Sequence, residues 1–171
     1  MTSFKKNNLG KMILLANLAA MAIVLGIIES RLELFVVPGA KLGLANLVSL
    51  VILYMFSYKD ALVVTIIRVV MVGLLSGYIG PPFWMGLGGG ILSITVMGIL
   101  KKLRAGIVLV SLMGSITHQI GQVLISVFIL ASVEIVMYLY IMIPLGVISG
   151  ILIGIMAEKF LNHYNMRNEI D

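Results

Sequence analysis

Residues 106–131 read GIVLVSLMGSITHQIGQVLISVFILA, a run without a single Asp, Glu, Lys or Arg. A helix needs roughly 20 predominantly apolar residues to cross the hydrocarbon core of a bilayer, so this run predicts a membrane-spanning helix. The same run carries Ser, His and Gln side chains, which are costly in lipid unless they are paired. This stretch therefore indicates both a membrane-spanning helical fold and a candidate site.

Five further apolar runs are bounded by charged or turn residues. With residues 106–131, they predict six helices, the others at about residues 12–28, 42–58, 61–78, 83–100 and 135–157. The chain is 61% hydrophobic, 11% charged and has a mean hydropathy of +1.16, whereas soluble domains are about 45–50% apolar and about 25% charged. We therefore expect a single all-α domain over residues 1–171, a bundle of six transmembrane helices. The polar tail, residues 158–171, is expected to fray into solvent.

The basic residues set the expected orientation, because cytoplasmic loops carry an excess of Lys and Arg. Nine Lys and Arg residues lie in segments on the same side as the N-terminus, whereas the opposite loops carry only Arg31 and Lys41. We expect a multi-pass protein of the cytoplasmic membrane with both termini in the cytoplasm. The net charge of +5 does not indicate nucleic-acid binding, because the basic residues sit at helix ends rather than along one face.

The 106–131 helix carries the richest polar stripe of the chain. Spacings of three and four residues place on one face Ser115, His118, Gln122 and Ser126. Lipid contact would leave these groups unpaired, so the face should point into the bundle. Interhelical hydrogen bonding alone would explain such a stripe. The presence of His118, Gln119 and Gln122 at mid-membrane depth makes us favour a ligand cavity, which Asn46 and Thr95 would complete.

Three charged regions leave alternatives open. Arg68, within the predicted third helix, either snorkels toward the cytoplasmic headgroups or contacts an anion or another helix inside the bundle. Residues 38–46, PGAKLGLAN, lead into the second helix, where the helix N-terminus and Lys41 suit an anionic ligand. A plain turn with a snorkelling lysine explains that segment equally well. Residues 29–33, ESRLE, form either a lid over an outward pocket or a solvated loop, and we favour the loop.

Small residues recur at four-residue spacing in three helices. They are Ala16 with Ala20, Gly86 with Gly90, and Gly146 with Gly150 and Gly154. Such stripes let helix backbones approach closely, either within the bundle or against another protein.

Motifs for catalysis or metal binding are scarce. The chain has no Cys, no HExxH and only two His residues, which lie far apart in the sequence. We therefore expect no catalytic residue, no metal and no cofactor, and nothing in the sequence indicates an enzyme.

The stretch 37–46, VPGAKLGLAN, together with 80–84, GPPFW, the glycines after it and the order of six helices, resembles one known family. It is the Gx transporter family, also called heptaprenyl diphosphate synthase component I. That family is similar to the substrate-binding (S) components of energy-coupling factor (ECF) transporters. The resemblance implies a bacterial six-helix protein that captures a vitamin-like molecule outside and docks on an energy-coupling transmembrane subunit driven by two ATPases. An Ala-x-x-x-Ala motif on the first helix of S components contacts that subunit, and Ala16 and Ala20 match it here.

The synthase label implies a different activity. Prenyl diphosphate synthases resemble one another in Asp-rich motifs that hold magnesium on the diphosphate. This chain has only Asp60 and Asp171, so it is not a self-sufficient synthase of that type.

Three hypotheses follow from the sequence. We prefer an S-component-like subunit for uptake of a small vitamin-like or isoprenoid- or quinone-related molecule, with a ligand, the bilayer and the ATPase module as partners. Its ligand would contact Asn46, Arg68, His118, Gln119 and Gln122, with Lys41 at the mouth. The alternatives are a non-catalytic membrane subunit of polyprenyl diphosphate or quinone synthesis, and a scaffold of a flavin-linked electron-transfer system.

Overall fold

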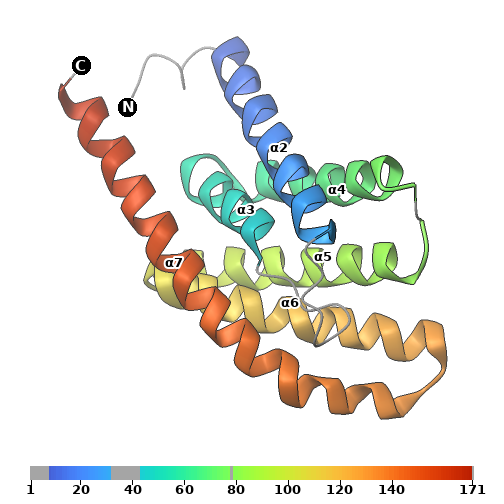
Figure 1. Cartoon of the computed structure of the whole chain (residues 1–171). Helices are drawn as coiled ribbons and strands as arrows, with labels where there is room; N and C mark the ends of the chain where they lie inside the picture. Colours follow the sequence, from blue (N-terminus) through green and yellow to red (C-terminus); the bar gives the residue numbers. More distant parts are fainter. Residues whose placement is uncertain (1–7, 32–42, 78, 171) are drawn as a thin grey trace.

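A computed structural model describes residues 8–31, 43–77 and 79–170 of the chain. These residues form six α-helices and one 3-10 helix, in the order α2 (Asn8–Arg31), α3 (Leu44–Met55), α4 (Tyr58–Leu75), α5 (Pro81–Lys102), α6 (Ile107–Leu130), η1 (Val133–Tyr138) and α7 (Leu139–Ile170). In Figure 1, α4, α5 and α6 lie roughly side by side, and α7 runs diagonally along the bundle. The predicted all-α fold with six helices is confirmed.

The short helix α3 lies at the centre of the bundle. Its sequence, LANLVSLVILYM, is apolar on almost every side, and a helix that is hydrophobic all round has to be buried. Residues 48–53 are all buried, and α3 contacts α2, α4, α5 and α7. The main hydrophobic core is built around this helix.

The glycine stripes bring helices together inside the bundle. In α5, a Cβ at Gly90 would lie 2.9 Å from Thr65 Cγ2 of α4, and one at Gly89 would lie 2.7 Å from the carbonyl oxygen of His118 in α6. On α7, Cβ atoms at the spaced glycines would meet α6 at 3.3 Å or less; these are Gly146, Gly150 and Gly154. Ala16 and Ala20, by contrast, lie exposed on α2.

Several predicted helix ends were wrong by a few residues. The second helix ends at Met55 rather than at 58, because the Ser57 side chain accepts a hydrogen bond from Asp60 N–H and so caps α4. The third helix ends at Leu75, before a turn in which Gly77 has a φ of +69°. Between α6 and α7, the predicted short turn at Glu134 is the helix η1.

The expectation that residues 158–171 fray is wrong, because α7 continues to Ile170. Ala157 and Leu161 are buried in the main core, and Tyr164 packs against it. These residues recur at spacings of three and four, which places them on one face of the helix. An apolar face within the polar sequence therefore holds the tail helical.

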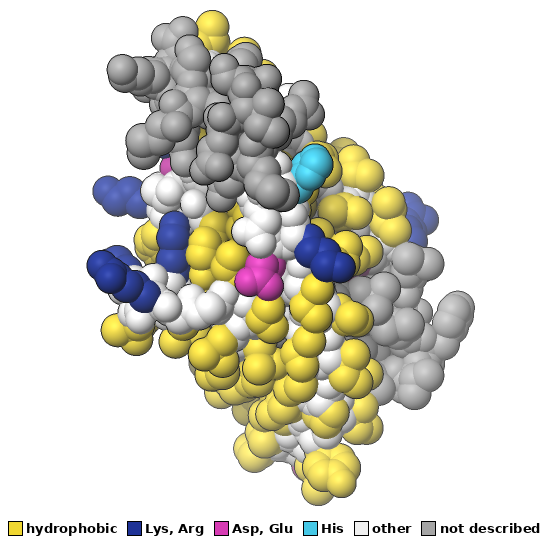
Figure 2. All heavy atoms as spheres, turned by 90° about the vertical axis from the view of Figure 1, so that its left-hand side faces the viewer, with side chains coloured by type: hydrophobic (Ala, Val, Ile, Leu, Met, Phe, Trp, Pro, Cys, Tyr) yellow, Lys and Arg dark blue, Asp and Glu magenta, His cyan; other side chains and the backbone are white. Residues whose placement is uncertain are grey.

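Four of the described helical segments are long and apolar enough to cross a membrane: Leu9–Arg31, Pro81–Lys102, Ile107–Leu130 and Val133–Tyr164. This is consistent with an integral membrane protein. The other two helices do not meet that description, since α3 has 12 residues and α4 contains Lys59, Asp60 and Arg68. Figure 2 shows Lys and Arg side chains in a band across one face, with mostly hydrophobic side chains below them.

We expect Gly121→Ala to destabilise the protein. A Cβ there would lie 2.8 Å from Gly89 Cα, and forcing extra volume into a packed interior costs about 1–3 kcal/mol. The control is Gly86→Ala, where the nearest atom is Val69 Cγ1 at 3.8 Å, so only the better helix propensity of Ala should act. Thermal unfolding in mild detergent measures both. A Gly121→Ala variant as stable as Gly86→Ala would contradict this packing.

Candidate functional site

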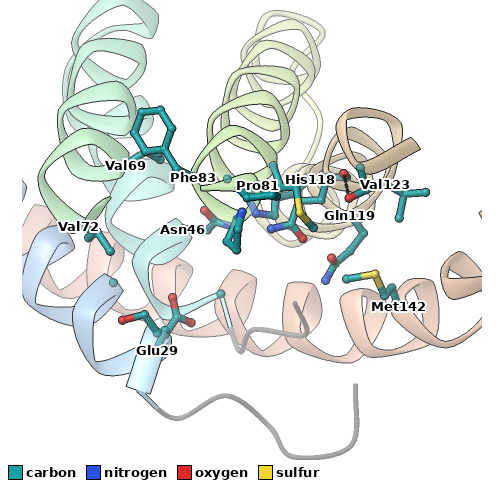
Figure 3. Close-up of a pocket in the computed structure, with 18 of the residues that line it drawn as sticks. Glu29, Asn46, Val69, Val72, Pro81, Phe83, His118, Gln119, Val123 and Met142 are labelled. Atoms are coloured by element: carbon teal, nitrogen blue, oxygen red, sulfur yellow. Dashed lines mark hydrogen bonds between the residues drawn. The ribbon is translucent and has the colours of Figure 1, made fainter. Parts of the chain in front are cut away.

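A cavity of about 660 Å³ lies at one end of the bundle. Its walls come from the C-terminal parts of α2, α4 and α6, the N-terminal parts of α3, α5 and α7, and η1. The size falls in the range of about 300–1,000 Å³ that is usual for small-molecule sites. Figure 3 shows Asn46, His118 and Gln119 directed toward this space, with Glu29 on one side and Met142 on the other.

Five residues predicted to bind a ligand lie together in the cavity wall: Asn46, Arg68, His118, Gln119 and Gln122. They come from α3, α4 and α6, which the sequence alone could not place next to one another. Ser115 and Ser126 of the predicted stripe also line the cavity. Lys41, predicted at the mouth, lies outside the described residues.

Thr95 was wrongly predicted to complete the cavity. Its hydroxyl donates to the Ile91 carbonyl oxygen at 2.7 Å and lies 3.2 Å from the Tyr58 hydroxyl. It is not among the residues that line the cavity. The spacing of Thr95 in α5 turns its side chain toward α4 instead.

Glu29 is buried, with 5% of its surface exposed, so a solvated loop at this position is wrong. Its Oε1 accepts a hydrogen bond of 2.6 Å from Leu44 N–H, the first residue of α3. The N-cap of α3 is Gly43 in the left-handed region (φ +77°), which supplies no side-chain acceptor. The carboxylate of α2 therefore takes the place of the missing cap. Glu33, its expected companion, lies outside the described residues.

This bond also bears on the anionic ligand predicted at the start of α3. The N-terminus of a helix attracts anions through its free N–H groups and its dipole. Here the chain's own Glu29 occupies that position on Leu44. The N–H of Leu44 is thus taken by the chain itself, whereas Lys41, the other part of that prediction, lies outside the described residues.

Arg68 is also buried, with 6% of its surface exposed, so the snorkelling alternative is wrong. Its Nη1 donates to Asn46 Oδ1 at 3.1 Å, and the negative charge of Glu29 is near enough to act on it. A buried charge needs an opposite charge and hydrogen bonds to be tolerated. Glu29, Asn46 and Arg68 therefore form one polar junction between α2, α3 and α4.

The polar wall of α6 divides into two kinds of group. The hydroxyls are satisfied within the protein, since Ser126 donates to the Gln122 carbonyl oxygen at 2.8 Å and Ser115 lies 3.1 Å from the Ser149 hydroxyl. The amides differ. Gln119 and Gln122 are 4% and 3% exposed, and the Oε1 atom of neither has a hydrogen-bond partner in the part of the chain that the structure describes.

Most of the remaining wall is apolar and was not predicted. It includes Val69, Val72, Phe83, Met85, Val123 and Met142. Nothing in the sequence separates these residues from ordinary core, because apolar side chains at helical spacing pack in either place.

The capping role of Glu29 was not predicted either, although the sequence carries one signal for it. Gly43 has no Ser, Thr, Asp or Asn side chain to cap the helix that follows, so the acceptor has to come from elsewhere in the chain, and Glu29 supplies it.

The cavity combines a largely apolar wall with a few polar side chains. Within the described ranges, no group of three or more His, Cys, Asp or Glu side chains could hold a metal ion. The Glu29 carboxylate and the Arg68 guanidinium have partners within the chain, and so do the hydroxyls of Ser30, Ser115, Ser126 and Ser149. An apolar cavity with a few convergent polar groups is the usual form of a small-molecule site.

A comparison with known families matches residues 18–160 to heptaprenyl diphosphate synthase component I. The chain belongs to this family. The match extends from α2 into α7 and so includes every wall of the cavity, and it confirms the resemblance found in the sequence. No curated protein and no solved structure matches the chain significantly.

We expect Arg68→Met to be destabilising, because it removes the hydrogen bond to Asn46 Oδ1 and the positive charge that acts on Glu29. Loss of a hydrogen bond made by a charged group costs about 1.5–3 kcal/mol. Adding Glu29→Gln should recover part of that loss, since Gln keeps an oxygen for Leu44 N–H but removes the charge. Thermal unfolding of both single variants and the double variant measures the coupling. Strict additivity would show that the two charges act independently.

Proposed function

We propose that this member of the component I family is a substrate-binding membrane subunit, similar to an S component, that holds a small and partly apolar molecule. The observation that carries the proposal is the cavity of about 660 Å³ with Asn46, Arg68, His118, Gln119 and Gln122 in its wall. A scaffold needs no such space and could be an occluded bundle. The cavity beside His118 thus favours the binding hypothesis over the scaffold.

The proposal includes a defined placement in the cytoplasmic membrane. All six helices would lie within the bilayer, with α3 as a short central helix of about 18 Å that is shielded from lipid by its neighbours. The cavity would open to the outside. The positions of Lys101 and Lys102 support this orientation, because basic residues favour the cytoplasmic side. They lie in the last turn of α5, at the opposite end of that helix from Pro81 and Phe83, which line the cavity.

A chain of this kind would depend on partners for energy. The exposed Ala16 and Ala20 would face an energy-coupling transmembrane subunit, and ATP hydrolysis by its ATPases would drive release of the ligand inward. The contrast with the glycine stripes supports this role. Those stripes pack within the bundle, whereas the Ala16–Ala20 stripe remains on the surface.

A second candidate is a non-catalytic membrane subunit of heptaprenyl diphosphate synthesis, which the name of the family favours. It would present a lipid substrate to a catalytic partner. Deletion of the protein would then lower long-chain quinones without changing vitamin uptake, whereas the transport hypothesis requires the reverse.

Native mass spectrometry of protein purified without added ligand tests the proposed function. We expect one small molecule bound per chain, lost or reduced when the cavity is filled by Val72→Trp. A lipid-facing change, Val63→Trp, is the control, because Val63 is 52% exposed on the same helix. Protein that is empty, yet retains a catalytic synthase chain, would reject transport in favour of the second candidate.

We expect Ala16→Leu with Ala20→Leu to separate docking from binding. Bulky side chains there should prevent co-purification of the ATPase module and abolish uptake, while the bound molecule is retained, because neither residue lines the cavity. Val63→Leu serves as the control for a larger exposed side chain elsewhere. Loss of the bound molecule in the Ala variant would count against a separate docking face.

A further inference from the structure

We propose that the cavity selects an uncharged amphiphile whose polar end carries a hydrogen-bond donor beside an acceptor, as an amide or imide does. This inference rests on the proposed function, that the cavity binds a ligand, and names the class of that ligand. It is carried by the two glutamine amides of α6 and by the charge balance of the Glu29–Arg68 junction.

The first step concerns charge. The described residues that line the cavity include one carboxylate, Glu29, and two guanidinium groups, Arg31 and Arg68. Arg31 is exposed at the end of α2, so Arg68 is the buried cation, and Glu29 acts on it. Among the described residues of the inner wall, the charges of Glu29 and Arg68 therefore offset each other, and the exposed Arg31 lies at the edge.

A phosphate or diphosphate head would disturb this balance. Its negative charges would meet Glu29, whose carboxylate is held in place by Leu44 N–H, and Arg68 already donates to Asn46. Like charges in a low-dielectric site repel strongly, and an anion buried beside Glu29, away from the exposed Arg31, is costly to desolvate. A neutral head avoids both penalties.

The second step concerns hydrogen bonding. The Oε1 atoms of Gln119 and Gln122 are buried and have no partner among the described residues, although the neighbouring serine hydroxyls are paired. Both glutamines line the cavity, three residues apart on one face of α6. The last torsion of a glutamine side chain turns readily, so the amide can present its oxygen, its NH₂ group or both to a ligand.

Two such amides match a ligand edge with a donor next to an acceptor. A head with acceptors alone, such as an ester, would leave the glutamine oxygens unpaired. Sites built to hydrogen-bond a group discriminate strongly against analogues that lack it, because buried polar groups are then left without partners. The selectivity should therefore reside in Gln119 and Gln122.

The third step concerns the rest of the ligand. Away from the amides the wall is formed by apolar side chains of four helices, among them Val72, Phe83, Val123 and Met142. A small polar molecule would leave this surface unfilled within a cavity of about 660 Å³. Burial of apolar area on the ligand provides the favourable free energy there. The ligand is thus an amphiphile, with its head at α6.

Three probes with the same twelve-carbon acyl or alkyl chain test the class: dodecanamide, methyl laurate and dodecyl phosphate. Binding to the protein in lipid nanodiscs can be followed by the fluorescence of Trp84, the single tryptophan. Its ring lies edge to face with Phe83 at 5.1 Å, and Phe83 lines the cavity. Empty nanodiscs correct for partition of the probes into lipid.

Dodecanamide should bind saturably, one molecule per chain, at least tenfold more tightly than either other probe. Gln119→Leu and Gln122→Leu should each remove most of that preference. Thr95→Val should leave it unchanged, because Thr95 lies outside the cavity wall. If a glutamine variant fails to fold, the ranking of the three probes on the wild-type protein still tests the proposed ligand class.

The contrary outcomes are distinct. Tighter saturable binding of dodecyl phosphate than of dodecanamide would overturn the neutral class while leaving a binding protein in place. Equal binding of all three probes would overturn the role of the two glutamines. No saturable binding would overturn the proposal, and if native mass spectrometry also found the protein empty, the proposed function would fail with it.

Discussion

The bond from Leu44 N–H to the Glu29 carboxylate is the interaction on which the polar end of this bundle depends. The first N–H groups of any helix need acceptors, and in an apolar interior water cannot supply them. Gly43 has no side chain to offer, so a carboxylate from α2 serves instead. That choice brings a negative charge into the bundle, and Arg68 of α4 compensates it while Asn46 of α3 orients the guanidinium.

The glycines of α5 and α7 impose the complementary constraint on the position of α6. Gly89 and Gly121 let the backbones of α5 and α6 touch, and Gly150 brings α7 against Leu112 and Ser115. Helices that approach so closely cannot rotate about their own axes, because rotation of α6 would drive its side chains into the neighbouring backbones. The polar face of α6 is thereby fixed toward the cavity.

These two constraints bear on what a member of the heptaprenyl diphosphate synthase component I family can contribute. The junction uses its charges on itself, and the hydroxyls near it are paired. What the described wall offers a ligand is a largely apolar space with the side chains of His118, Gln119 and Gln122 in it. Such a space suits recognition of a small molecule, which is the role that we propose.

The sequence by itself determined the class of fold, the number of helices and the face of α6 that turns inward. Each of these follows from local rules: apolar runs of sufficient length, and the three- and four-residue spacing of Ser115, His118, Gln122 and Ser126. It also predicted five of the cavity residues, since polar side chains of apolar helices are costly in lipid and therefore face the interior of the bundle. The exposed position of Ala16 and Ala20 and the helical tail held by Leu161 could not be read in this way.

Only the tertiary structure decided how Glu29, Asn46 and Arg68 are used. They are 17 and 22 residues apart in sequence, and nothing local says that the end of one helix will meet the start of a second and the middle of a third. The same holds for Thr95, whose chemistry suited a cavity but whose hydroxyl lies beside Tyr58. The physical reason is that burial and pairing of polar groups depend on which helices pack together, and that packing is set by contacts distant in the sequence.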